Sequence, residues 1–272
     1  MPKKIFTIFI YAFALIGFGL TAGYFAVRFG LTNTKGIVDK QRENFLSGEF
    51  ATTSPEWSSL PEWTTLKEAV TKDKELIYRA SVASGVPARL IVAQLVTEQL
   101  RFFFDDRESY KKFFEPLKIL GSQTKFSWGV MGIKEDTAIQ IEQNLRNKNS
   151  PFYLGPTYEQ ALEFKTSTST DSIKQERFVR MTDQHAHYYS YLYAGLYLKQ
   201  IVTQWKNAGF DISDRPEILS TLYNIGFKNS KPNPNPSSGG AQIPVGDKVY
   251  SFGTLAGDFY NSNELLDEFP KN

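Results

Sequence analysis

The chain contains no cysteine and only two histidines, and these absences exclude several classes of chemistry. Without a thiol, the protein cannot form disulfides, use a thiolate nucleophile, bind zinc through cysteine or carry a lipid-modified cysteine. His185 and His187 are two positions apart, so their side chains point to different sides of a helix, and no third ligand is evident in the sequence. We therefore expect neither a metal site nor a cofactor.

The chain also lacks an excess of charge of one sign. Its 31 basic and 29 acidic residues give a formal net charge of +2, and no basic patch stands out. This balance argues against a nucleic-acid partner. We find neither a Walker-type phosphate loop nor a Ser-His-Asp arrangement.

One long hydrophobic run is present near the amino terminus. Residues 5–27 are uncharged and mostly apolar, and 23 residues are enough to cross a bilayer core of about 30 Å. A cleaved secretory signal is the alternative, but the run is long for one, and apolar residues continue after the small residues 21–23. We favour a single uncleaved membrane anchor over residues 1–28. Basic residues lie on both sides of the run, so the positive-inside rule does not fix its orientation.

The rest of the chain divides into a tether and one domain. Residues 29–65 are rich in Gly, Ser, Thr and Pro, and we expect Trp57 and Trp63 to dock this tether on the domain that covers residues 66–272. Within the domain, apolar residues recur mostly at helical spacing. Residues 165–176 and 228–244 have the composition of loops, and residues 249–253 form the one candidate strand. The expected fold class is mainly α, with helices over roughly residues 66–82, 87–104, 134–146, 186–206 and 216–224.

Glu98 is the most informative residue of the domain. It lies in the otherwise uncharged run 90–100 and shares a helical face with Ile91 and Leu95. Burial would raise the pKa of this carboxyl, and a carboxyl that is protonated near neutral pH suits a general acid for glycosidic bond cleavage. The plainer alternative is a Glu at a helix end that points to solvent or pairs with Arg101.

Four segments around Glu98 follow one pattern in order. They are Gly85-Val-Pro-Ala-Arg-Leu-Ile-Val-Ala-Gln-Leu-Val-Thr-Glu98, Ser127-Trp-Gly-Val-Met-Gly-Ile133, Ala194-Gly-Leu-Tyr-Leu198 and Leu222-Tyr-Asn-Ile-Gly226. Over roughly residues 66–228, this set resembles the catalytic domain of the lytic transglycosylases, relatives of goose-type lysozyme. The resemblance implies a lysozyme-like helical domain behind a single N-terminal transmembrane helix.

The resemblance also implies a reaction and a site. Glu98 matches the general acid and base that cleaves the β-1,4 bond between N-acetylmuramic acid and N-acetylglucosamine and leaves a 1,6-anhydro product. The implied partner is the glycan strands of peptidoglycan, and the implied location is the bacterial cytoplasmic membrane, with the domain in the periplasm or outside the cell. The positions that match substrate-binding residues are Ser127, Gly129, Met131, Tyr223 and Asn224.

Plainer readings of these positions stay open at this point. Gly129 and Gly132 also suit an ordinary tight turn. Tyr223 also suits the core, and Asn224 also suits a helix C-terminus. The chain departs from the family where Gln99 follows the Glu in place of the usual Ser.

Two further departures leave rival functions open. Gly132 replaces the usual Gln of the turn, and Tyr191 stands where an Asn is common, so a catalytically silent scaffold that binds peptidoglycan is one rival. A muramidase that uses water is the other, with a second carboxylate from residues 105–108 or Glu135 at about 5 to 9.5 Å from Glu98.

Overall fold

The computed structural model describes residues 54–104, 127–164, 169–183 and 186–271, within a compact unit that covers Ala51–Asn272. The hydrophobic run at residues 5–27 lies outside the described residues, as do residues 105–108 and His185. In the part of the chain that is described, no helix is long and apolar enough to cross a membrane.

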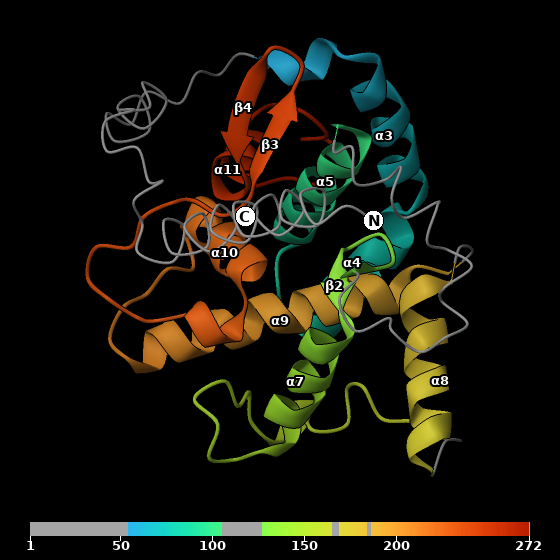
Figure 1. Ribbon diagram of the computed structural model, residues 1–272, viewed down its shortest axis with the longest axis vertical. Coiled ribbons are helices and arrows are strands. Elements are labelled where there is room, and N and C mark those ends of the chain that lie inside the picture. Colours follow the sequence, from blue (N-terminus) through green and yellow to red (C-terminus); the bar gives the residue numbers. More distant parts are fainter. Residues whose placement is uncertain (1–53, 105–126, 165–168, 184–185, 272) are drawn as a thin grey trace, which may run out of the picture. The chain divides into compact units, whose positions relative to one another are not determined.

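The described residues form a mainly α-helical fold, which confirms the expected class (Figure 1). Two small antiparallel sheets of two strands each accompany the helices. The α-helices are α3 (Pro61–Lys72), α4 (Lys74–Ser84), α5 (Ala88–Phe104), α7 (Glu135–Arg146), α8 (Thr170–Thr182), α9 (Tyr188–Asn207), α10 (Pro216–Ile225) and α11 (Phe252–Asn261). The strands are β1 (Ser127–Trp128), β2 (Ile133–Lys134), β3 (Gln242–Val245) and β4 (Lys248–Ser251), and short 3-10 helices occur at Glu56–Ser59, Pro156–Tyr158 and Phe227–Asn229.

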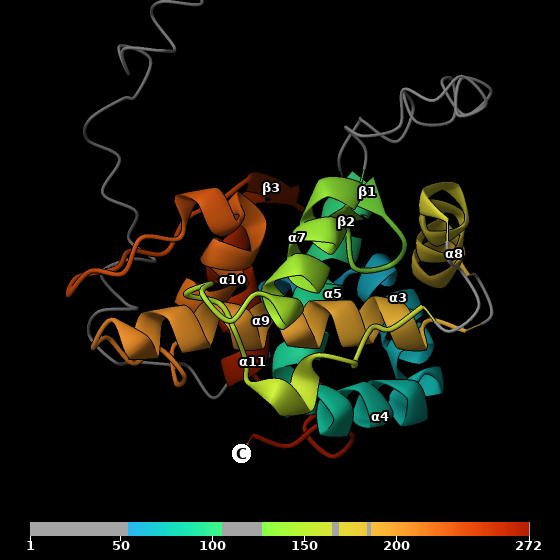
Figure 2. The same cartoon turned by 90° about the horizontal axis from the view of Figure 1, so that it is seen from below.

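Helix α5 is the centre of the fold. Every residue from Ala88 to Glu98 is buried, because other helices surround this mostly apolar run. It packs against α3, α4, α9, α10 and α11, and Figure 2 shows it beside the long helix α9. The interior position of α5 fixes the surroundings of Glu98.

Arg89 joins α5 to the end of the chain. Its side chain is fully buried, and its guanidinium donates five hydrogen bonds of 2.8–3.1 Å to backbone carbonyls. Desolvation lowers the pKa of Arg89 to about 10. The acceptors belong to Phe259, Tyr260, Ser262, Glu264 and Phe269.

The compact unit begins before the expected boundary at residue 66. Trp57 and Trp63 are buried in the core and contact each other edge to face, with ring centroids 5.0 Å apart. Their expected docking is therefore confirmed, but residues 54–65 belong to the domain. The helical pattern after Leu66 is two helices, because the chain turns at Asp73 between α3 and α4.

Helix α8 shows that the loop predicted at residues 165–176 is wrong from residue 170 on, and residues 165–168 lie outside the described residues. It starts with a capping box, in which Ser169 and Ser172 bond each other's backbone amides. It is held to α7 by a buried ion pair, since Arg177 donates to both oxygens of Glu142 at 2.6 and 2.7 Å. The buried residues of α8 are mostly arginines, which a search for apolar periodicity counts as polar. The helix was therefore predicted as a loop.

The strands also differ from the sequence prediction. Residues 249–251 of the candidate strand at 249–253 belong to β4, which pairs with β3, whereas residues 252–253 begin α11. The hairpin β1–β2 was not predicted, because each of its strands has only two residues and no alternation of apolar side chains can be recognised over that length. The predicted loop at residues 228–244 holds the end of the last 3-10 helix and the start of β3.

Candidate functional site

Glu98 is buried near the C-terminal end of α5. Its exposed fraction is 3%, so the alternative in which it points to solvent is wrong. Its carboxylate accepts hydrogen bonds from Nε of Arg101, at 3.0 Å, and from Nη2 of the same side chain. The pairing with Arg101, which is part of the plainer alternative to a catalytic Glu98, is therefore confirmed. Burial disfavours the charge on the carboxylate, whereas the guanidinium stabilises it.

The turn between β1 and β2 packs directly on this carboxyl group. Gly132 has φ +62°, and a Cβ atom at this position would lie 2.6 Å from both Cδ and Oε2 of Glu98. Any side chain would therefore collide with the carboxyl as well as strain the backbone. Gly129, at the other end of the turn, also has φ +62°, and a Cβ there would lie 1.9 Å from the carbonyl oxygen of Met181 in α8. The turn fits between α5 and α8 only with these two glycines.

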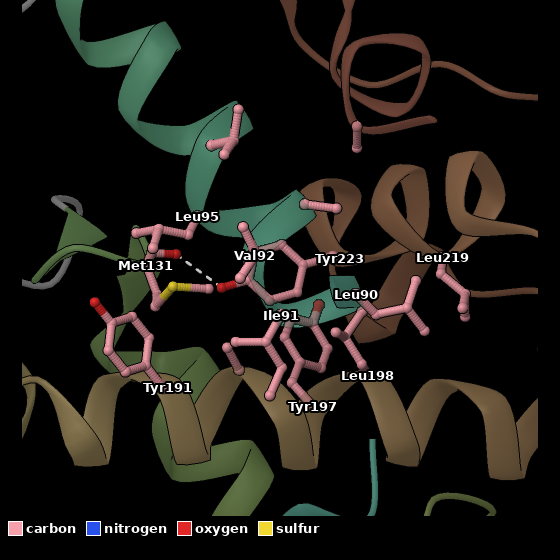
Figure 3. Packing of buried hydrophobic residues seen from close by; sticks show 14 of the residues in the cluster. Leu90, Ile91, Val92, Leu95, Met131, Tyr191, Tyr197, Leu198, Leu219 and Tyr223 are labelled. Carbon is pink, nitrogen blue, oxygen red and sulfur yellow. Dashed lines mark hydrogen bonds between the residues drawn. The ribbon is translucent and has the colours of Figure 1, made fainter. Parts of the chain in front are cut away.

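Two side chains bond adjacent carbonyls of the same turn. Nε2 of Gln99 donates to the carbonyl of Val130 at 2.6 Å. The hydroxyl of Tyr223, from α10, donates to the carbonyl of Met131 at 2.7 Å, drawn as a dashed line in Figure 3. Burial and the nearby charge of Glu98 raise the pKa of Tyr223 well above its usual value. The phenol therefore stays neutral and remains a donor.

The structure brings some of the predicted site residues together and separates others. Glu98, Met131 and Tyr223 meet around the turn, but the Met131 side chain is fully buried in the core, beside Leu95 (Figure 3). Because the whole residue is buried and its carbonyl already accepts the Tyr223 hydroxyl, Met131 offers no contact to a ligand in this structure. Asn224 accepts a hydrogen bond from the amide of Ala241 at 2.9 Å, and so holds the segment before β3.

The two remaining predicted positions lie in the hairpin that contains the turn. Gly129 packs on α8 and not on Glu98. Ser127 lies in β1 and pairs with Lys134 of β2.

A cavity of about 280 Å³ lies beside the turn, between α3, α5 and the start of α9. Gln99 and Val130 belong to its lining, so the cavity borders the segment that packs on Glu98. A polar group that was not predicted also lines it. Oδ2 of Asp73 accepts a hydrogen bond from the Tyr191 hydroxyl at 2.5 Å and lies 2.5 Å from Nδ1 of His187. More than a hundred residues separate Asp73 from these partners, and no short-range sequence pattern reports such a contact.

In the described part of the chain, no three His, Asp or Glu side chains are grouped so that they could hold a metal ion. Comparisons with protein-family models, with curated proteins and with solved structures find no match for this chain.

Proposed function

We propose that this protein is a peptidoglycan lytic transglycosylase with a lysozyme-like fold, anchored to the bacterial cytoplasmic membrane by residues 5–27. Glu98 is its general acid and base. The substrate is the glycan strand of peptidoglycan, and the bond cleaved is the β-1,4 bond that follows N-acetylmuramic acid. The domain works in the periplasm or outside the cell.

The observation that supports this proposal best is the meeting of three separated motifs at one carboxyl group. Glu98 comes from the first of the four segments, Gly132 of the second packs on its carboxyl, and Tyr223 of the fourth bonds the neighbouring carbonyl of Met131. The first and fourth segments are more than a hundred residues apart in the sequence. A buried carboxyl packed against backbone is a suitable environment for a general acid once its guanidinium partner, Arg101, has moved away.

The reaction needs one carboxyl group in two protonation states. Protonated Glu98 gives its proton to the glycosidic oxygen as the bond to the anomeric carbon breaks. The carboxylate then takes the proton of the muramic acid 6-hydroxyl, whose oxygen forms the new bond to the anomeric carbon. The proton returns to Glu98, and no water is consumed. This cycle requires Arg101 to release the carboxyl before each turnover, and the Arg101 side chain is 16% exposed, at the last turn of α5.

A hydrolytic muramidase is the second candidate, and one observation favours it. Glu135 begins α7, three residues after Gly132, and it is 4% exposed. Its Oε2 atom is buried without a hydrogen-bond partner in the structure as described. Buried carboxylate oxygens are normally paired, so Glu135 is the residue to test for a second catalytic role.

The experiment compares the full-length chain, purified in detergent, with Glu98→Gln on isolated peptidoglycan. Glu98→Gln keeps the shape of the side chain and removes the acid. Glu75→Gln, at an exposed position of α4, is the matched control. The proposal predicts anhydro-muropeptides from the wild type and from Glu75→Gln, and none from Glu98→Gln.

Other outcomes of this experiment contradict the proposal. Hydrated products that are lost in Glu135→Gln would establish the muramidase instead. Binding of peptidoglycan without any product, in all variants, would favour the silent scaffold.

A further inference from the structure

The turn that packs on Glu98 has few contacts of its own to hold it. It joins strands of only two residues each, and the bond across it, from the amide of Gly132 to the carbonyl of Gly129, is long at 3.4 Å. Both of these residues are glycines, which leave the unfolded backbone more freedom than other residues do. A turn of this kind needs external contacts to keep one position.

Besides the packing of Gly129 on α8 and of Met131 in the core, hydrogen bonds from two further helices hold neighbouring carbonyls of the turn. Gln99 of α5 bonds the carbonyl of Val130, and Tyr223 of α10 bonds the carbonyl of Met131. The two donors lie more than a hundred residues apart and reach the turn from different elements. Together they fix both peptide groups that precede Gly132, the residue in contact with the Glu98 carboxyl.

We propose that Gln99 is a positioning residue, whose hydrogen bond to Val130 keeps the backbone of Gly132 against the Glu98 carboxyl and so sets the geometry of catalysis. The catalytic part of this inference rests on the function proposed above. Gln99 follows Glu98 in the same helix, so the residue that orients the wall of the site moves together with the acid.

The size of the expected effect follows from the strength of one hydrogen bond. Loss of a net 0.5–1.5 kcal/mol corresponds to roughly a 2- to 10-fold increase in the population of the displaced turn. Misplacement of reacting groups by about 1 Å can lower a rate by up to about 100-fold. Ground-state binding of a long glycan depends on many other contacts, so the rate constant should change more than KM.

The test uses Gln99→Met, which keeps the length of the side chain and removes the donor. Gln140→Met, at an exposed position on α7, is the control for the added methionine. Hydrogen exchange of the full chain in detergent should show 2- to 10-fold faster exchange at the amides of residues 130–133 in Gln99→Met. The exchange rates of α9 should not change, and Gln140→Met should match the wild type.

The kinetic measurement separates this inference from the proposed function. With an active wild type, Gln99→Met should lower kcat severalfold, by up to about 10-fold, and leave KM within about twofold. Unchanged exchange at the turn, or an unchanged kcat in an active protein, overturns the inference. An inactive wild type refutes the proposed function, and the exchange rates then decide by themselves whether Gln99 holds the turn on Glu98.

Discussion

Gly132 and Glu98 are packed so closely that no Cβ atom fits between them. The position of a Cβ at Gly132 would lie 2.6 Å from the carboxyl carbon of Glu98. Gly132 is thus restricted to glycine by the lack of space beside Glu98 as well as by its positive φ.

The first prediction concerns this contact. Gly132→Ala should lower the free energy of unfolding by about 2–4 kcal/mol, through left-handed strain and a steric clash. It should also abolish any activity that depends on Glu98. Gly246 has a similar φ of +59°, and the nearest atom to its Cβ position is a Leu60 methyl at an ordinary 3.7 Å. Denaturant unfolding of Gly246→Ala therefore measures the strain without the clash, and an equal loss in the two variants would contradict the clash.

The second prediction concerns the ion pair of Glu98 with Arg101. Arg101→Gln leaves a buried carboxylate without its guanidinium and should cost about 3 kcal/mol at neutral pH. In the background of Glu98→Gln, the same substitution should cost less than about 1 kcal/mol, because no charge is left unpaired. The double-mutant cycle by urea denaturation checks this, and additive losses would show that the two side chains do not interact in solution.

The third prediction concerns Arg89. Arg89→Met should destabilise the protein by about 3–5 kcal/mol, because five buried carbonyl oxygens lose their donor at once. Arg146→Met, at an exposed position of α7, should cost less than about 0.5 kcal/mol. Thermal unfolding of the two variants gives the comparison, and a small effect at Arg89 would refute its role in holding the chain end.

The fourth prediction concerns alkaline pH. Several buried tyrosines have raised pKa values, chiefly because burial disfavours the phenolate. Above pH 10 the unfolded chain loses these protons and the folded chain keeps them, so stability must fall as pH rises. Each such tyrosine should remove about 1.4 kcal/mol of stability per pH unit above 10. The residues concerned are Tyr191, Tyr193, Tyr197 and Tyr223.

Unfolding free energies between pH 8 and 11 test this prediction, with tyrosine ionisation followed by ultraviolet absorbance. Phenolate absorbance that rises before the protein unfolds, to the extent expected for all tyrosines, would refute it.

The sequence predicted the helices that are held by apolar side chains and failed where polar contacts hold the chain. The burial of α5 and of Trp63 follows from hydrophobic residues that any periodicity analysis detects. Helix α8 was not predicted, because its buried residues include Arg177 and Arg180, which count as polar in a sequence. The turn at Asp73, which divides α3 from α4, was not predicted because the helical spacing of apolar residues continues across it.

The candidate site was likewise predicted only in part, because some of its contacts join segments that are far apart in the sequence. Ordered motifs identified Glu98 and Tyr223, and the structure places both at one turn. The role of Gln99 could not be predicted, because its partner is a backbone carbonyl 31 positions away and any residue can offer a carbonyl. The partners of Asn224 and Gly129 likewise depend on the packing of distant segments.

The most direct test of the central claim is the origin of the oxygen atoms in the products. Peptidoglycan is digested by the full-length protein in water enriched in heavy oxygen, and the released muropeptides are weighed. An intramolecular transfer through Glu98 predicts products that are one water lighter than hydrolysis products and contain no heavy oxygen at the new end. Incorporation of one heavy oxygen per cleaved bond would contradict the transglycosylase account and identify a hydrolase.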